Sequence, residues 1–179
     1  MLKNTENKYG IIAKTLHWIS ALTVLGLFVV GYWMVDLTYY SEWYKTAPLW
    51  HKSIGILLLI ASLFRLFWRF YSPAPKAITS HSKQVKLASS LAHIGIYILL
   101  FTLMTSGYLI STADGRGIAV FNWFSVPTLG EIFSDQADIA GLIHKYVAYA
   151  LIALSLLHAV AAVKHHVIDK DDTLKRMTR

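Results

Sequence analysis

The chain has 179 residues, of which 55% are hydrophobic and only 15% are charged, whereas a soluble domain carries roughly 25% charged residues. We therefore expect a single domain, residues 1–179, whose solvent is lipid. The absence of cysteine excludes disulfides, iron–sulfur clusters and haem attached through a CxxCH motif, and the net charge of +7 follows the membrane topology described below rather than nucleic-acid binding.

Four stretches approach the roughly 20 mostly apolar residues that a membrane-spanning helix needs. The expected spans lie at about residues 11–35, 48–71, 87–113 and 138–166. No small-residue cleavage site of a signal peptide precedes or follows the first span, so we expect it to be retained. In the second span, Arg65 and Arg69 lie in the last turns, where long basic side chains can extend to the membrane interface.

Two connections differ in composition. SPAPKAITSHSK joins the second and third spans, and its prolines end the second span because proline cannot continue a helix. TADGRGIAVFNWFSVPTLGE joins the third and fourth spans, where Gly115 and Gly117 permit turns. Its aromatic residues suit the headgroup zone of a membrane.

The basic residues predict the orientation of the chain. Thirteen of the seventeen Lys and Arg residues lie on the side of the termini and the SPAPKAITSHSK connection, either in these segments or in the adjoining ends of the spans. The remaining four, Lys45, Lys52, Arg116 and Lys145, lie among acidic residues on the other side. Because connections rich in Lys and Arg stay in the cytoplasm, we expect both termini to be cytoplasmic.

Besides His165 and His166 at the inner end of the fourth span, five of the eight histidines lie within the expected spans, where ionisable groups are costly and usually functional. His144 and His158 are fourteen residues apart, a rise of about 21 Å that leaves them on one face of the helix, near opposite membrane surfaces. His51 has the depth of His144 on the outer side, and His17 has the depth of His158 on the inner side. His93 has an inner depth too, so spacing alone leaves His17 and His93 as alternatives.

Two opposed histidine pairs in a helical bundle predict two haem groups. A haem with a histidine on each face exchanges electrons but has no open position for oxygen, and bundle cores are a usual place for such sites. Gly55 and Gly141 lie close to His51 and His144 and would let a flat macrocycle approach. A closed zinc site is disfavoured, because it needs about four ligands in one cluster.

The segments YGIIAKTLHWIS, LWHKSIGILLLIASLFRLFWR, LAHIGIYILL, GLIHKYVAYALIALSLLHAVAAVKHH and DDTLKRM resemble the bacterial cytochrome b561 family over nearly the whole chain. The resemblance implies an all-α, multi-pass, integral membrane four-helix bundle of the bacterial inner membrane with two haem b groups. It implies His17 and His158 as axial iron ligands of the inner haem and His51 and His144 as those of the outer haem, with His93 beside the inner haem but not a ligand. Ile96 stands where some relatives have a second histidine.

The family that the chain resembles includes superoxide oxidases, and the resemblance therefore implies superoxide, a small anion, as a candidate substrate at the outer haem. Lys52 directly follows His51, Lys145 directly follows His144, and Arg116 lies in the outer connection. Positive charge around an entry draws anions inward, so these three residues are candidates for attracting superoxide. Haem propionates or lipid phosphates are the alternative partners of the same cations.

On the inner side we expect a site for ubiquinone or another isoprenoid quinone. His165 is seven residues after His158 and shares its helix face, and histidine exchanges protons near neutral pH. Trp18 and Lys164 are neighbouring candidates for the quinone site. The alternative is that His165 and His166 are solvated interfacial residues.

These expectations combine into two hypotheses. The first is a superoxide:ubiquinone oxidoreductase, in which the cofactors supply the chemistry and the protein supplies ligation and electrostatics. The second is a cytochrome subunit that exchanges electrons between quinol and a periplasmic redox protein, because the long outer connection resembles a branch of the family that often accompanies a lipocalin-like protein. A metal or proton transporter is disfavoured by the lack of acidic residues inside the spans.

Overall fold

The computed structural model describes residues 1–79 and 81–179, so Ser80 of the predicted inner connection lies outside the described residues. Most of it is formed by four long helices, α1 (Ile11–Met34), α2 (Thr46–Tyr71), α3 (Lys83–Thr112) and α4 (Gln136–Val167). All four are long and apolar enough to cross a membrane. The expected membrane-spanning helical bundle is confirmed, although α3 begins earlier than residue 87.

Local signals explain where these helices begin and end. α2 ends just before Pro73, which cannot continue a helix. The Ser82 side chain accepts a hydrogen bond from the backbone N–H of Val85 and so caps α3. α4 begins after Asp135, whose φ of 58° turns the chain, and it ends with basic residues that complement the carbonyl end of the helix dipole.

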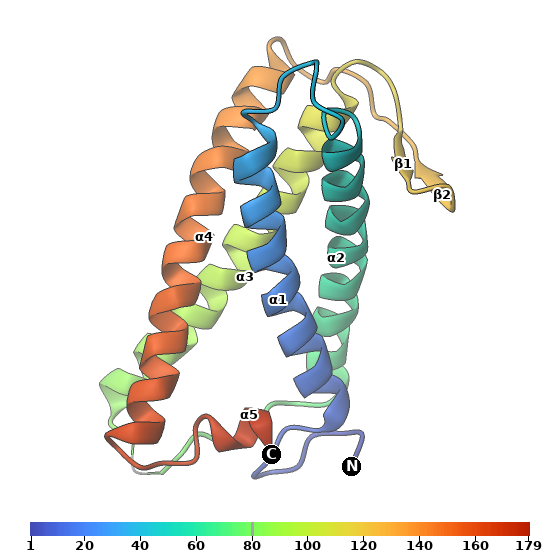
Figure 1. Cartoon of the computed structure of the whole chain (residues 1–179). Helices are drawn as coiled ribbons and strands as arrows, with labels where there is room; N and C mark the ends of the chain where they lie inside the picture. Colours follow the sequence, from blue (N-terminus) through green and yellow to red (C-terminus); the bar gives the residue numbers. More distant parts are fainter. Residues whose placement is uncertain (80) are drawn as a thin grey trace.

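The helices associate as two pairs. α3 packs along α4 and α1 along α2, whereas α1 and α4 share few contacts and diverge towards the end that carries both termini (Figure 1). The central cluster of buried side chains is small and consists of Leu58, Leu100, Met104 and Leu151. Most large apolar side chains are exposed, as expected of helices whose outer faces contact lipid tails.

The outer connection contains a β-hairpin that we did not predict. β1 (Ile118–Val120) pairs antiparallel with β2 (Phe124–Val126), and the hairpin lies beside α2 (Figure 1). Ile118 and Val120 are buried against Ile56 of α2. The short alternating pattern of IAV, buried at its two ends, was the available sequence signal for this strand.

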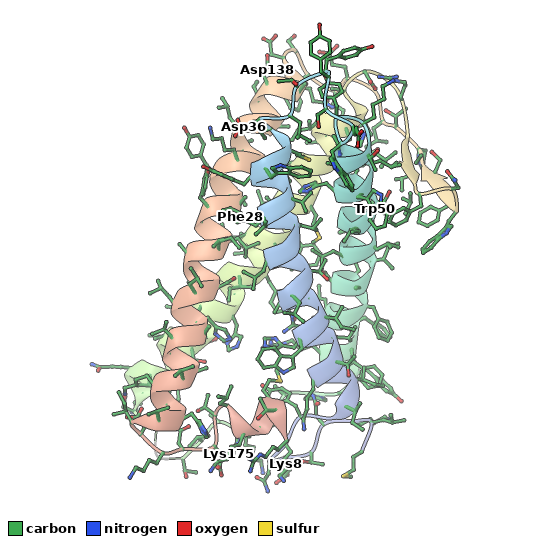
Figure 2. All side chains as sticks on the ribbon, viewed as in Figure 1. Lys8, Phe28, Asp36, Trp50, Asp138 and Lys175 are labelled. Atoms are coloured by element: carbon green, nitrogen blue, oxygen red, sulfur yellow. The ribbon has the colours of Figure 1, made fainter. Side chains whose placement is uncertain are left out.

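The C-terminal segment closes the inner end of the bundle. The short helix α5 (Lys175–Thr178) lies across this end (Figure 1). The Trp18 indole donates a hydrogen bond to the backbone carbonyl of Met177, and Arg176 donates one to the carbonyl of Lys76. Figure 2 shows Lys8 and Lys175 at this end and Asp36 and Asp138 at the opposite end, as the distribution of charge along the sequence indicated.

Candidate functional site

The structure brings together both histidine pairs that were expected from the sequence. Near the outer end, the rings of His51 on α2 and His144 on α4 have their centres 6.2 Å apart. Near the inner end, the ring centres of His17 on α1 and His158 on α4 are 6.4 Å apart. α4 therefore contributes one histidine to each site. The partner histidine is on α2 in the outer pair and on α1 in the inner pair.

The two separations fit a single metal ion between the rings of each pair. A bond from a metal to an imidazole nitrogen is about 2 Å long, and the nitrogen lies about 1 Å from its ring centre, so two axial imidazoles place their ring centres about 6 Å apart. Both measured values, 6.2 Å and 6.4 Å, agree with this spacing. The donor sets therefore fit the axial ligation of haem iron.

The ring of His144 is oriented by a hydrogen bond to the backbone of α3. Its Nδ1 lies 2.9 Å from the backbone carbonyl oxygen of Leu103, to which it donates its proton. In the neutral ring this leaves the lone pair on Nε2 free for a metal. The buried Nδ1 of His51, in contrast, has no hydrogen-bond partner in the part of the chain that the structure describes.

Two glycines allow other helices to approach the outer rings. A Cβ atom on Gly31 of α1 would lie 3.0 Å from the His51 ring, and one on Gly107 of α3 would lie 3.0 Å from the His144 ring. Gly55 and Gly141, which the sequence had indicated, would carry their Cβ atoms into open space. The close contacts are therefore made by glycines on the facing helices, which spacing along one helix does not reveal.

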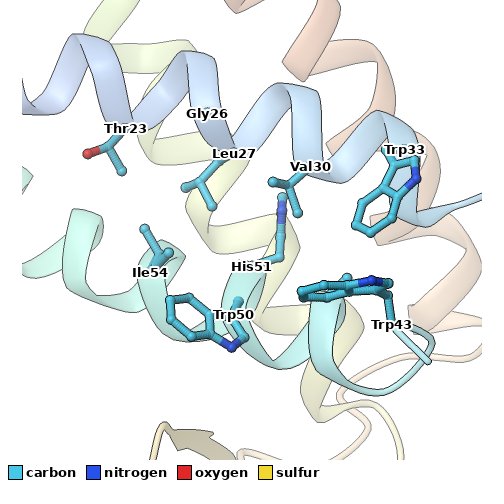
Figure 3. A pocket seen from close by; sticks show the side chains of 10 residues that line it. Thr23, Gly26, Leu27, Val30, Trp33, Trp43, Trp50, His51 and Ile54 are labelled. Atoms are coloured by element: carbon cyan, nitrogen blue, oxygen red, sulfur yellow. The ribbon is translucent and has the colours of Figure 1, made fainter.

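An apolar cavity of about 390 Å³ adjoins His51 between α1 and α2, within the size range of ligand pockets. Figure 3 shows the His51 ring extending from α2 towards α1 beside Val30 and Leu27. The cavity is lined by Thr23, Gly26, Leu27, Val30, Trp33, Trp43, Ala47, Trp50, His51 and Ile54. A Cβ on Gly26 would meet nothing within 4 Å, so this wall leaves room for a flat ligand.

Arg65 is a residue of the inner site that we misinterpreted from the sequence. Its guanidinium does not extend to the interface but turns inward, with Nη2 3.0 Å from Nδ1 of His17 and with the Tyr97 ring centre 5.6 Å away. Among the described residues it forms no salt bridge. Because guanidinium only donates hydrogen bonds, His17 Nδ1 accepts here, and iron binding through Nε2 requires Arg65 to release that nitrogen.

His93 also reaches the inner site, with its ring centre 5.1 Å from that of His158. This separation is shorter than the roughly 6 Å of two axial ligands on one metal, whereas the His17–His158 separation matches it. The Nδ1 atom of His93 donates to the carbonyl of Ser89 at 2.7 Å. The geometry favours His17 over His93 as the partner of His158.

The three outer cations have different surroundings. Lys52 and Lys145 are exposed and directly follow His51 and His144. Arg116, in contrast, forms an ion pair with Asp114, whose side chain accepts hydrogen bonds from it. Those hydrogen bonds hold the pKa of Asp114 below its usual range. The charge of Arg116 is therefore balanced locally, whereas those of the two lysines are available to an approaching anion.

The inner-side candidates belong to a polar cluster under the bundle. His165 Nδ1 lies 2.7 Å from an Asp169 oxygen and 3.3 Å from Asp171 Oδ2, which is also 2.7 Å from His81 Nε2. Burial alone would raise the pKa of Asp171, but hydrogen bonds from Thr173 and His81 outweigh it and lower the pKa to about 2. The cluster links α4, the α2–α3 connection and the C-terminal segment.

The other two quinone candidates are held by neighbours at the same end. Lys164 Nζ lies 2.7 Å and 2.9 Å from the two Asp169 oxygens, and the Trp18 indole donates to Met177. Trp18 follows His17 directly, with the ring centres 5.3 Å apart. Trp18 is thus close to the inner histidine pair, and Lys164 is part of the polar cluster.

Known proteins that are similar to this chain match it over nearly its whole length. The family described as prokaryotic cytochrome b561 matches residues 8–179. The cytochrome b561 homolog 2 of Escherichia coli K12 is 50% identical over 97% of this chain and 93% of the relative. The probable superoxide oxidase of Yersinia pestis is 27% identical over 96% of both chains, and the cytochrome b562 of Cereibacter sphaeroides is 28% identical over 97% of both.

Proposed function

The chain belongs to the prokaryotic cytochrome b561 family of redox-active membrane proteins, and on that premise we propose that it binds two haem b groups and carries electrons between an outer-side donor and ubiquinone. The proposal rests on the two histidine pairs of α4, whose ring separations of 6.2 Å and 6.4 Å each suit one iron. When bound, haem b supplies a reversible one-electron couple at an iron that has no open position for oxygen.

Each binding site has its own set of protein groups. His51 and His144 hold the outer haem, with His144 oriented by Leu103. His17 and His158 hold the inner haem. Arg65 is partly buried and has no acidic partner among the described residues, which is costly for a cation in a membrane bundle. It is therefore suited to bind a haem propionate, and in doing so it releases Nδ1 of His17.

The proposed outer donor is superoxide. Lys52 and Lys145 are exposed cations next to both outer histidines, and positive potential raises the encounter rate of small anions. Two superoxide ions leave as dioxygen and supply two electrons, which, together with two protons from the inner side, convert ubiquinone to ubiquinol. The relative named as a probable superoxide oxidase supports this reaction class.

On the inner side, His165 is the proposed proton exchanger of the quinone site. It contacts Asp169 and Asp171, so carboxylates can receive and return protons beside it. Trp18 supplies an aromatic wall close to His17, and Lys164 adds positive charge at this end. For this quinone site to take up protons from the cytoplasm, both termini must lie in the cytoplasm. We also propose that residues 1–179 act as one domain.

Anaerobic stopped-flow absorption after mixing the oxidised holoprotein with superoxide tests the outer reaction. We expect rapid haem reduction that slows about tenfold or more in the Lys52→Gln/Lys145→Gln double variant and that weakens with rising salt, because electrostatic steering is screened. Arg116→Gln is the matched control and should have a smaller effect, since its charge is already balanced by Asp114. Haem that ignores superoxide contradicts the proposed donor.

A second function is favoured by two observations. The relative at 50% identity is named only as a cytochrome, and one of the three outer cations is neutralised by an ion pair. In this alternative the outer haem exchanges electrons with a periplasmic redox protein. Haem reduction by quinol together with no response to superoxide in the same stopped-flow experiment supports this function.

A further inference from the structure

We propose that the β1–β2 hairpin is a membrane anchor that lies in the outer headgroup zone, with Trp123 and Phe124 in contact with lipid. The inference does not depend on which molecule donates electrons. It concerns a connection whose aromatic residues suit the headgroup zone and whose family resemblance, in contrast, favours a periplasmic protein partner.

The hairpin is fastened to the side of α2 rather than extended into solvent. The hydroxyl of Ser53, which is 0% exposed, accepts a hydrogen bond from the Phe121 N–H at 2.9 Å and donates one to the Ala119 carbonyl at 3.4 Å. Ile118 and Val120 are buried against Ile56. A hydroxyl and an apolar side chain one turn apart on α2 therefore hold the hairpin.

These contacts place the hairpin below the outer end of α2. Ser53 and Ile56 are seven and ten residues from Thr46, where the helix begins, which corresponds to about 10 Å and 15 Å along its axis. α2 has 26 residues, about 39 Å, compared with roughly 30 Å of hydrocarbon in a bilayer. The exposed Lys52 directly precedes Ser53, and its charge has to reach the headgroups, so we place the excess of about 9 Å at the outer end of α2. Ser53 then lies at the outer boundary of the hydrocarbon, and Ile56 lies about one helical turn below it.

The composition of the hairpin suits lipid better than a soluble protein partner. Residues 117–130 contain no charged side chain, and the neighbouring Asp114 and Arg116 neutralise each other. Trp123 is 71% exposed and Phe124 is 44% exposed. Aromatic residues are enriched at membrane–water interfaces, and water among the headgroups can still satisfy the open edges of a short sheet, which the hydrocarbon could not.

The same region of α2 continues the lipid-facing surface. Ile60, Leu63 and Phe67 follow the hairpin contact along the helix and are exposed, as residues facing lipid tails are. On the other side of the contact, Trp50 packs edge-on against Phe121 with ring centres 5.3 Å apart. Together with Trp50, the hairpin therefore forms an aromatic cluster at the outer interface, directly above the exposed apolar side chains of α2.

Site-directed spin labelling tests this placement, because the chain has no cysteine and each label is unique. A nitroxide is attached to Trp123→Cys in the haem-loaded protein in phospholipid nanodiscs, and its collision rates with oxygen and with a water-soluble nickel chelate are measured. Val29→Cys on the exposed face of α1 and Tyr40→Cys in the α1–α2 connection serve as lipid and water references. Phe124→Cys provides a second hairpin position.

We expect the label at residue 123 to be more accessible to oxygen than to nickel, with a ratio below that of residue 29, as the headgroup zone requires, and at least several-fold above that of residue 40. The label at residue 124 should follow the same order. A ratio at both hairpin positions equal to that of residue 40 overturns the proposal and leaves the hairpin as a water-exposed surface for a protein partner. Retention of haem absorption confirms that each labelled protein is folded.

Discussion

At the residue scale, the histidines show how much spacing alone can predict. The interval between His144 and His158 on one helix determines their relative depth and face, because helix geometry is regular. Whether His17 or His93 faces His158 depends on how α1 and α3 pack against α4, and the ring separations of 6.4 Å and 5.1 Å favour His17. The orientation of Arg65 towards His17 was likewise not predictable from the sequence, since a basic residue near a helix end can extend either way.

The assignment of ligands predicts haem stoichiometry. His51→Ala and His17→Ala should each reduce the haem content from about two per chain to about one, since an iron that loses one of two axial ligands is held less tightly. The measurement is the pyridine haemochrome spectrum of purified protein. His93→Ala is the control and should retain both haems; loss of a haem from this variant, with retention in His17→Ala, would reverse the assignment of the inner ligand.

The close approach of Gly107 to His144 gives a second prediction. Gly107→Ala and Gly141→Ala both place alanine in a helix and both gain about 1 kcal/mol of helix propensity, but only the Cβ at residue 107 meets a histidine ring, at 3.0 Å. Displacement of an oriented ligand costs about tenfold or more in metal affinity. We expect haem to transfer to apomyoglobin faster from the Gly107→Ala variant than from the Gly141→Ala variant. Equal rates in the two variants would contradict the role of Gly107 in admitting the His144 ring.

At the scale of secondary structure, apolar length and charge predicted the four helices, whereas the hairpin was missed. A span of about 20 apolar residues is a strong signal, but three-residue strands such as Ile118–Val120 carry little periodicity. The hairpin also depends on a distant partner, because Ser53 lies 68 residues before Phe121. Contacts of this kind are formed by tertiary packing and leave no local pattern.

Two buried serines on α2 allow the hairpin contact to be tested. Ser53→Ala should destabilise the protein by about 1–2 kcal/mol, because the Phe121 N–H loses its partner, and should speed hydrogen exchange at residues 118–126. Ser62 is equally buried, but among residues 1–79 and 81–179 its hydroxyl has no hydrogen-bond partner, so Ser62→Ala should leave stability and exchange nearly unchanged. Thermal unfolding and hydrogen-exchange mass spectrometry measure both effects, and identical behaviour of the two variants would exclude the proposed contact.

At the scale of the whole molecule, the C-terminal segment joins the inner ends of α1 and α4 to the α2–α3 connection. Lys14 contacts the carbonyl of Arg179, Trp18 contacts Met177, and Asp171 contacts His81 and His165. These groups lie within the basic end of the molecule, which the distribution of Lys and Arg predicts to be cytoplasmic. The segment therefore connects helices that share few contacts with each other at this end.

The low pKa of Asp171 predicts that this connection is sensitive to acid. Because the pKa is about 2 in the folded protein and about 3.9 in an unfolded chain, its stabilising effect is complete above pH about 4 and is lost as the pH falls towards 2. A nitroxide on Arg179→Cys should become mobile over that interval. Asp171→Asn should make it mobile at neutral pH, while Asp172→Asn, which alters an exposed ion pair, should not; a label that is equally immobile in both variants contradicts this role of Asp171.

The sequence by itself determined the membrane environment, the number of spans and the depths of the histidines, because these follow from hydropathy, charge and helix geometry along one chain. The tertiary structure decided which rings face each other, which glycines admit them, where Arg65 points and how the hairpin lies on α2. These features depend on contacts between helices, and a periodic pattern in one helix carries no information about the rotation of its neighbour.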